Sequence, residues 1–233
     1  WPLRHLGRTA VKTGLRGRHG NKGAVAWRCL LGNTAMCIVN CHLAAGQENW
    51  AARNSDLATI SRSISFPWIA GRETCYRSMG DHDLVILFGD LNYRIELPRD
   101  RIVSHLREND LETLLERDQL AMNITRCPLL ASLKESPITF NPTYKYDPGT
   151  ALWDTSEKQR APAYCDRILY SAADTMSDFP PSLLCLEYAS IPEMLSSDHR
   201  PIFARFKVTC YGDDQMAKKR FRLKVLAELL ERI

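Results

Sequence analysis

Short apolar or alternating runs, rich in β-branched side chains, recur along the chain and are typical of β-strands. They predict strands over residues 24–29, 35–42, 84–88, 167–170 and 201–209. Apolar residues at helical spacing predict helices over residues 49–63, 99–109 and 111–117. Because strands and helices are mixed without strict alternation, we expect sheet-on-sheet packing with helices on the outer faces.

Two segments fall outside this pattern. Residues 139–163 form a long, polar, Pro-containing stretch, and a loop of that length in a compact domain is more often functional than idle. Residues 216–233 place leucines on one face and begin with basic residues, which predicts a basic amphipathic helix or linker over 211–233. Such a helix either packs on a neighbouring domain or contacts a membrane directly.

Composition narrows the class of protein. Of the 233 residues, 45% are hydrophobic and 25% are charged, which is ordinary for a globular chain with a core. The net charge of +4 is too small to suggest DNA wrapping, but it agrees with an anionic substrate or membrane surface. No apolar run approaches the roughly 18 to 20 residues that span a bilayer.

The eight cysteines contain no CxxC pair, and several lie inside apolar strand-like runs. Free cysteine packs as a small hydrophobic residue, so we interpret them as buried free thiols in a reducing compartment. The expected location is the cytosol or its membrane faces.

Polar clusters follow or precede the predicted strands, where loops on a rigid scaffold commonly place catalytic groups. His42 closes one strand, and Asp90 and Asn92 follow another. Residues two apart in extended backbone share a face, so Asp90 and Asn92 can address one point together. Asp166 begins a further strand, and the pair Asp198 and His199 precedes the last one.

Each cluster by itself is compatible with a structural histidine, a turn, a cap or a surface ion pair. Together they supply the carboxylates, amide and imidazoles that metal-assisted attack of water on a phosphate requires. A hard divalent cation prefers oxygen ligands. A carboxylate orients or deprotonates water, and an imidazolium stabilises charge on phosphoryl oxygens.

Other motifs point to the substrate. The sequence GNKG (20–23) predicts a small-residue turn presenting Asn21 and Lys22. The long polar segment carries tyrosines and cations that form a candidate clamp for several phosphates, the alternative being ordinary solvated loop charge. These residues are Tyr144, Lys145, Lys158 and Arg160.

Six blocks in this order resemble the type II inositol polyphosphate 5-phosphatases, a family that includes synaptojanin. They are GNKGAV (20–25), HLAAG (42–46), FGDLNYR (88–94), PTYKY (142–146), PAYCDR (162–167) and SDHRP (197–201). The FGDLNYR and PAYCDR blocks are highly specific. The resemblance extends from about Val11 to Phe206 and implies a four-layer α/β (α+β) sandwich of the DNase I-like, endonuclease/exonuclease/phosphatase type.

The resemblance also implies roles for individual residues. Asp90 would activate the attacking water, Asn92 would orient it or the phosphate, and His42 and His199 would contact the phosphoryl group. Asp166 would hold the tautomer of His199, and no cysteine, including Cys165, would act as a nucleophile. Asp198 would lie beside a Mg²⁺ cofactor. The substrate-binding positions would be Asn21, Lys22, Arg94, Tyr144, Lys145, Lys158 and Arg160.

The family's domains open with a strand and a metal-binding glutamate well before the GNKG block. Only 19 residues precede Gly20 here, and none of them is acidic. Residues 1–210 are therefore expected to be a catalytic domain that lacks its N-terminal part, including the main Glu ligand and one or more core strands. We expect this chain alone to be weakly active or inactive.

The leading hypothesis is Mg²⁺-dependent removal of the 5-phosphate from a phosphoinositide such as phosphatidylinositol 4,5-bisphosphate, or from a soluble inositol polyphosphate. The partner would be a lipid at a cytoplasmic membrane surface, with flanking domains possible and no nucleic acid. One alternative is a phosphoinositide-binding remnant without catalysis. Another is a nuclease of the same fold, because Asp90, Asn92 and His199 would serve either reaction.

Overall fold

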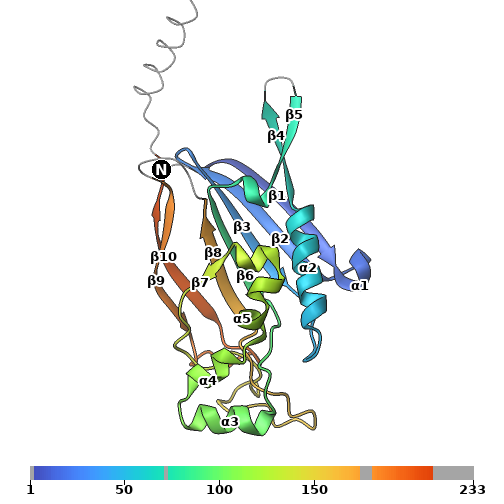
Figure 1. The fold of residues 1–233 in the computed structure, drawn as a ribbon, viewed down its shortest axis with the longest axis vertical. Helices are drawn as coiled ribbons and strands as arrows, with labels where there is room; N and C mark the ends of the chain where they lie inside the picture. The colour runs from blue at the N-terminus through green and yellow to red at the C-terminus, as the bar shows by residue number, and fades with distance from the viewer. Residues whose placement is uncertain (1–2, 71–72, 174–179, 212–233) are drawn as a thin grey trace, which may run out of the picture.

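Six strands form one central sheet in the computed structural model, which describes residues 3–70, 73–173 and 180–211 (Figure 1). In spatial order they are β1 (Leu3–Thr13), β2 (His19–Leu31), β3 (Thr34–His42), β6 (Leu84–Asp90), β8 (Asp166–Ala172) and β7 (Lys134–Glu135). All neighbours are antiparallel except β3 and β6, which run parallel and are joined by a crossover that contains α2 (Trp50–Ser63).

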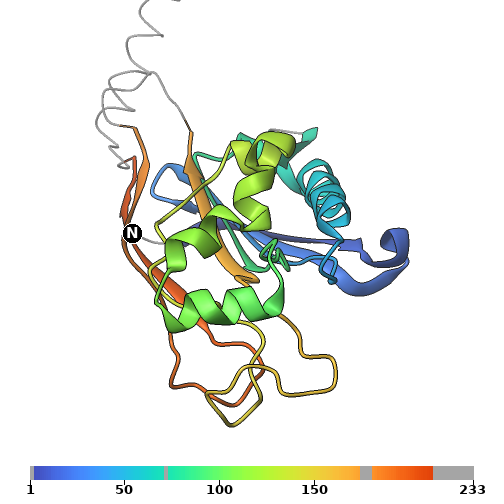
Figure 2. The same ribbon diagram turned by 60° about the horizontal axis from the view of Figure 1, so that its bottom comes forward.

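Helices cover one face of this sheet, as Figure 2 shows. Leu57 and Ile60 of α2 are fully buried against Val39 and Leu87 of the central strands. Two shorter helices, α5 (Gln119–Asn123) and α6 (Pro128–Ala131), contribute Leu120 and the buried leucines 129 and 130 to the same core cluster. The apolar positions of these helices therefore define the main core.

A second sheet of two antiparallel strands, β9 (Ser182–Ser190) and β10 (Ile202–Thr209), lies on the opposite face. Leu183 packs with Leu84 and Tyr170, and the Tyr170 ring meets Phe206 edge-on at 4.9 Å between centroids. The order of layers is thus helices, six-stranded sheet and second sheet, which are three of the four layers expected for the sandwich. In the part of the chain that the structure describes, no helix covers the outer face of β9 and β10 (Figures 1 and 2).

The second sheet covers only part of the central one. On β2, Val25 is 54% exposed and Trp27 is 66% exposed. Their neighbours in the strand, Ala24 and Ala26, are buried on the helical side. The described residues therefore leave an apolar face of β2 open to solvent.

The remaining elements lie around the sheets. A separate ribbon of β4 (Ser65–Ala70) and β5 (Glu73–Ser78) projects at one end, and α3 (Arg99–Arg107) and α4 (Leu111–Glu116) lie at the other, beside the long irregular segment (Figure 1). The short elements are α1 (Gly14–Gly17), η1 (Met79–Asp81) and η2 (Ile124–Arg126). No described helix has the length and apolarity needed to cross a membrane.

The predicted strands and helices are confirmed within a few residues of their bounds, and residues 139–163 form no helix or longer strand. The predicted turn at 20–23 is wrong, because these residues continue β2. Gly23 is needed there for another reason: a Cβ on it would lie 2.0 Å from the carbonyl oxygen of Val11 in β1. The helix predicted at 216–233 lies outside the described residues.

The cysteine prediction holds where it is tested. Seven cysteines are free, and five of them are buried. Cys165 is fully buried with its thiol directed to the carbonyl oxygen of Tyr93, and burial raises the pKa of that thiol well above its usual value. A buried, protonated thiol is a poor nucleophile, which agrees with a structural role.

Candidate functional site

Strand register brings the predicted catalytic residues into one row at one end of the central sheet. His42 is the register partner of Asp90 across β3 and β6, and Asp90 is the partner of Asp166 across β6 and β8. Parallel β3 and β6 end at the same edge, and antiparallel β8 begins there. Three residues that are far apart in sequence therefore meet at the start of the loops.

The backbone after β6 is shaped to place Asp90 and Asn92 together. Gly89 has φ +126°, and a Cβ there would lie 2.2 Å from the Cys41 carbonyl oxygen, so only glycine fits. Asn92 adopts φ +57°, and its buried Nδ2 donates to Asp90 Oδ2 at 3.1 Å and to the Leu43 carbonyl at 3.1 Å. The amide is thereby fixed beside the carboxylate.

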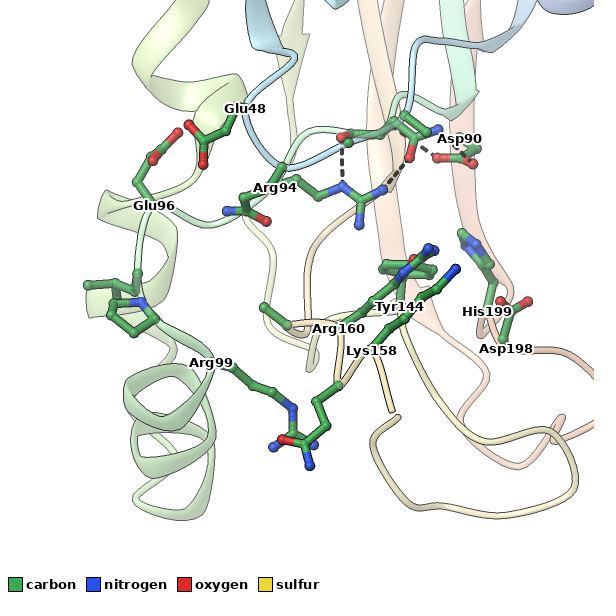
Figure 3. Close-up of a pocket in the computed structure, with 18 of the residues that line it drawn as sticks. Glu48, Asp90, Arg94, Glu96, Arg99, Tyr144, Lys158, Arg160, Asp198 and His199 are labelled. Carbon is green, nitrogen blue, oxygen red and sulfur yellow. Dashed lines mark hydrogen bonds between the residues drawn. The ribbon is translucent and has the colours of Figure 1, made fainter. Parts of the chain in front are cut away.

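Arg94 holds the other side of that amide. Its Nη2 donates to Asn92 Oδ1 at 2.6 Å and its Nε donates to the Asn92 carbonyl at 3.0 Å (Figure 3). The guanidinium is buried and also lies over the Tyr144 ring, 4.5 Å from its centroid. Arg94 thus connects Asn92 to the aromatic wall of the cleft.

His199, in the loop between β9 and β10, is held by Asp166 at the start of β8. Its Nδ1 donates to Asp166 Oδ2 at 2.8 Å, and the same oxygen accepts a bond from Thr143 Oγ1 at 2.6 Å. The Tyr144 ring lies 4.7 Å from the imidazole, centroid to centroid. With Nδ1 occupied, Nε2 is the ring nitrogen left for a ligand.

The environment raises the pKa values of both His199 and Asp90 above their ordinary values. Burial alone would lower the pKa of His199, but the bond to Asp166 and the charges of Asp166, Asp90 and Asp198 raise it above its ordinary value. Burial raises the pKa of Asp90, and the nearby Asp166 charge adds to this effect. The site therefore favours a cationic His199 facing a carboxylate of increased basicity.

His42 is more exposed than the other catalytic candidates. Its Nε2 lies 2.5 Å from Lys22 Nζ and 3.2 Å from Asp90 Oδ2. Burial lowers the pKa of His42, and the Lys22 charge also opposes its protonation. Burial likewise lowers the pKa of Lys22, although Asp90 and Asp56 act in the opposite direction. A neutral His42 beside a charged Lys22 is consistent with these shifts.

These residues open onto a cleft of about 880 Å³. Arg160 and Lys158 extend from the irregular segment toward His199 and Asp198, and Arg160 Nη1 donates to Tyr144 Oη at 3.2 Å (Figure 3). Residues that line the cleft include Lys22, His42, Asp90, Asn92, Arg94, Tyr144, Lys158, Arg160, Asp198 and His199. The predicted site residues are thus largely brought together.

Two predicted substrate-binding residues lie differently. Lys145 lines an adjoining hollow with Lys158 and Arg160, and its Nζ donates to Asp198 Oδ2 at 2.6 Å. That bond raises the pKa of Lys145. Asn21 is exposed and lines a second hollow over β1, β2 and β3, which shares Lys22 and His42 with the main cleft, but Asn21 does not line the main cleft itself. The prediction for Asn21 therefore has no support from the geometry of the cleft.

A metal site is not complete in the described part of the chain. No group of three or more His, Cys, Asp or Glu side chains lies close enough there to hold a metal ion. Asp198 Oδ2 already accepts from Lys145, and Asn92 Oδ1 already accepts from Arg94. The described residues therefore do not fit a divalent cation by themselves.

Sequence reasoning missed the residues that shape the loop after β3. Arg53 of α2 is fully buried, donates to the carbonyls of Ala44 at 3.1 Å and Gly46 at 2.7 Å, and bonds Gln119 Oε1. Nothing in its sequence context distinguishes Arg53 from a solvent-exposed helix residue. Also missed were the cleft residues Gln47, Glu48, Glu96 and Arg99. Figure 3 places Glu48 and Glu96 at the end of the cleft away from His199.

Comparison with known proteins agrees with this geometry. The sequence model of endonuclease/exonuclease/phosphatase family 2 matches residues 2–205. The chain is 45% identical over 213 residues to a probable inositol polyphosphate 5-phosphatase of Schizosaccharomyces pombe, covering 87% of this chain and 17% of that protein. It is 40% identical to the mouse type II inositol 1,4,5-trisphosphate 5-phosphatase, covering 85% of this chain and 19% of that protein.

Among solved structures, the inositol polyphosphate 5-phosphatase domain of SPsynaptojanin, in complex with inositol (1,4)-bisphosphate and calcium, is 37% identical. It superposes with a TM-score of 0.81 over 99% of this chain and 62% of that chain. A Cimex nitrophorin at 21% identity, with a TM-score of 0.65 over 87% of this chain and 64% of that chain, shares the fold alone.

The chain spans 17–19% of the length of these curated relatives. The matched residues include the whole row formed by β3, β6 and β8. The chain therefore belongs to the endonuclease/exonuclease/phosphatase family, and its relatives within that family are synaptojanin-like inositol polyphosphate 5-phosphatases.

Proposed function

We propose that the protein containing this chain hydrolyses the 5-phosphate of a phosphoinositide such as phosphatidylinositol 4,5-bisphosphate, or of a soluble inositol polyphosphate. The observation that carries this proposal is the bonded pair of Asp166 and His199, which faces Asp90 and a wall of cations in one cleft. Relatives named as inositol polyphosphate and inositol trisphosphate 5-phosphatases support it.

The catalytic assignments follow from the bonds and charges. His199, kept cationic by Asp166, would stabilise charge on the phosphoryl oxygens. Asp90, with its raised pKa, would accept a proton from the attacking water, and Asn92 would orient that water or the phosphate. Neutral His42 would contact the phosphoryl group. Attack would occur in line on phosphorus without a phospho-enzyme.

The recognition assignments follow from the cationic side of the cleft. Arg94, Tyr144, Lys158 and Arg160 would bind the inositol ring and its other phosphates, because guanidinium and ammonium groups donate charge-assisted bonds to phosphate. Lys22 would act at the catalytic end. Lys145 would join them after exchanging its bond with Asp198 for one with a phosphate, which makes Asp198 available.

Mg²⁺ is the proposed cofactor, because it is the hard divalent cation most suited to oxygen ligands next to phosphate. Asp198 is the proposed ligand from this chain. The other ligands would have to come from outside the described residues, since those residues do not complete a site. Residues 1–233 alone are accordingly expected to show little or no turnover. The proposed location is peripheral, at cytoplasmic membrane surfaces that display the lipid.

The incomplete metal site favours one second candidate for residues 1–233 alone, namely binding of phosphoinositide without turnover. Liposome binding in the absence of phosphate release would support it. Robust turnover by residues 1–233 would exclude it, and cleavage of plasmid or abasic DNA would instead favour a nuclease.

The test uses the full-length protein with vesicles that contain phosphatidylinositol 4,5-bisphosphate, and measures phosphate release with and without Mg²⁺. Asp166→Asn and Lys145→Ala are expected to reduce release strongly. Lys207→Ala is the matched control, because Lys207 lies exposed on β10. Release that persists in both site variants at the rate of the control would refute the assignments.

A further inference from the structure

A buried polar cluster lies behind the catalytic row, where β8, β7, β9 and the start of α5 meet. Arg167 is 3% exposed, and its Nη1 donates to Asp118 Oδ2 at 2.7 Å. Its Nε and Nη2 donate to Glu135 Oε1 at 2.8 Å and Oε2 at 2.5 Å. Tyr188 Oη donates to Glu135 Oε1 at 2.8 Å and accepts from the backbone N–H of Ile168 at 3.2 Å.

Stability alone does not require such a cluster. Moving charged groups from water into the protein interior costs a desolvation free energy that their mutual attraction barely offsets. Apolar residues of similar volume often stabilise the fold equally well. A network of hydrogen bonds does, however, hold its members in one geometry, because each bond depends on distance and angle.

The cluster joins the two sheets whose ends supply the catalytic pair. Arg167 directly follows Asp166 in β8, and Ile168 comes next in the same strand. Tyr188 belongs to β9, which pairs with β10, and the loop between β9 and β10 carries His199. A path of hydrogen bonds therefore runs from the sheet that holds Asp166 to the sheet that holds His199.

We propose that Tyr188, acting through Glu135 and Arg167, is a positioning residue that sets the separation of Asp166 and His199. The bond between Asp166 and His199 spans the gap between the two sheets at 2.8 Å. Sliding of one sheet against the other by a fraction of an ångström would misalign it. Misplacement of catalytic groups by about 1 Å costs up to about 100-fold in rate.

The chain offers a matched control in Tyr170. Tyr170 is 7% exposed and Tyr188 is 8% exposed, and each has a bonded hydroxyl. The hydroxyl of Tyr170 bonds Ser136 Oγ at 3.0 Å, which lies next to Glu135 on the same side of the molecule. This bond does not reach β9. Both Tyr→Phe variants keep the ring and its packing, and only Tyr188→Phe removes a polar link between the sheets.

The first measurement is steady-state kinetics of the purified full-length protein on vesicles of phosphatidylinositol 4,5-bisphosphate. Its interpretation rests on the proposed function. Tyr188→Phe is expected to lower kcat about tenfold with KM unchanged, since substrate-binding groups do not move. Tyr170→Phe is expected to keep kcat within about twofold of the wild type, while thermal unfolding reports the stability of both variants. Equal kcat in the two variants would overturn the proposal.

The second measurement does not depend on activity. The Nδ1 proton of His199, bonded to a carboxylate, is expected to give a far-downfield proton resonance that disappears in His199→Asn. It should shift or broaden in Tyr188→Phe and stay unchanged in Tyr170→Phe. An unchanged resonance in Tyr188→Phe would overturn the inference. Absence of phosphate release by the wild type would refute the proposed function, and the resonance would still decide the role of Tyr188.

Discussion

The bond between Asp166 and His199 makes a quantitative prediction about pH dependence. Asp166→Asn keeps an oxygen that accepts from His199 Nδ1 but removes the negative charge. A hydrogen bond to a charged group contributes about 1.5–3 kcal/mol, against about 1 kcal/mol for a bond between neutral groups. The variant loses this difference in favour of the imidazolium, so the pKa of His199 should fall. Because this imidazole is only 28% exposed, solvent screens the effect weakly.

The sign follows from the raised pKa of His199 in the folded protein. The imidazolium stabilises the fold fully below the unfolded pKa, and this contribution is lost as pH rises through the higher folded pKa. Activity that needs the cation should be lost over the same pH range. Asp166→Asn moves this basic limb of the kcat profile to lower pH.

The assay is phosphate release by the full-length protein across pH 5 to 9, with an NMR titration of His199 as an independent reading of its pKa. Asp100→Asn is the control, because Asp100 lies exposed in the first turn of α3. A basic limb at the same pH in wild type and Asp166→Asn would refute the argument that this carboxylate maintains the charge of His199.

Three further predictions concern the backbone after β6, the Arg94 side chain and the exposed face of β2. Gly89→Ala should lower the free energy of unfolding in urea by about 3 kcal/mol or more, because Gly89 has a positive φ and a Cβ there would clash with the Cys41 carbonyl oxygen. Gly149→Ala, where a Cβ would meet nothing within 4 Å, should lower it by about 1 kcal/mol. Equal losses in the two variants would contradict this reasoning. Arg94→Lys should lower kcat about tenfold, since one ammonium cannot replace both bonds to Asn92, and unchanged kcat would reject that role. Replacing Val25 and Trp27 by Thr should reduce self-association of residues 1–233 in sedimentation velocity, because an exposed apolar patch is removed; an unchanged apparent mass would count against it.

Much of the site could be predicted because its residues stand at strand ends. His42, Asp90 and Asp166 each border an apolar run, and that position alone places a polar side chain at the edge of a sheet. Which strands are neighbours in the central sheet could not be predicted from the apolar runs. The parallel contact between β3 and β6 depends on how α2 crosses over, and this is a property of packing rather than of local pattern.

Other features were missed for physical reasons that the structure makes clear. The half-buried face of β1 carries Gly7, Thr9, Val11 and Thr13, of which only Val11 is a large apolar residue, so the sequence lacks the apolar alternation that marks a half-buried strand. Gly23 has the composition of a turn residue, but it serves the close approach of β1 and β2. Arg53 was missed because its partners are backbone carbonyls and a side chain 66 residues away, Gln119, which leave no mark on the sequence around it.

Tyr144 joins substrate recognition to catalysis. Its ring packs beside His199 and under the Arg94 guanidinium, and its hydroxyl accepts a bond from Arg160. Arg94 in turn fixes the amide of Asn92. Any ligand that moves Arg160 toward a phosphate therefore acts, through one aromatic ring, on residues at the reacting centre. This arrangement explains why the irregular segment needs a rigid tyrosine between its cations and the catalytic row: a flexible clamp would bind phosphate without aligning His199 and Asn92.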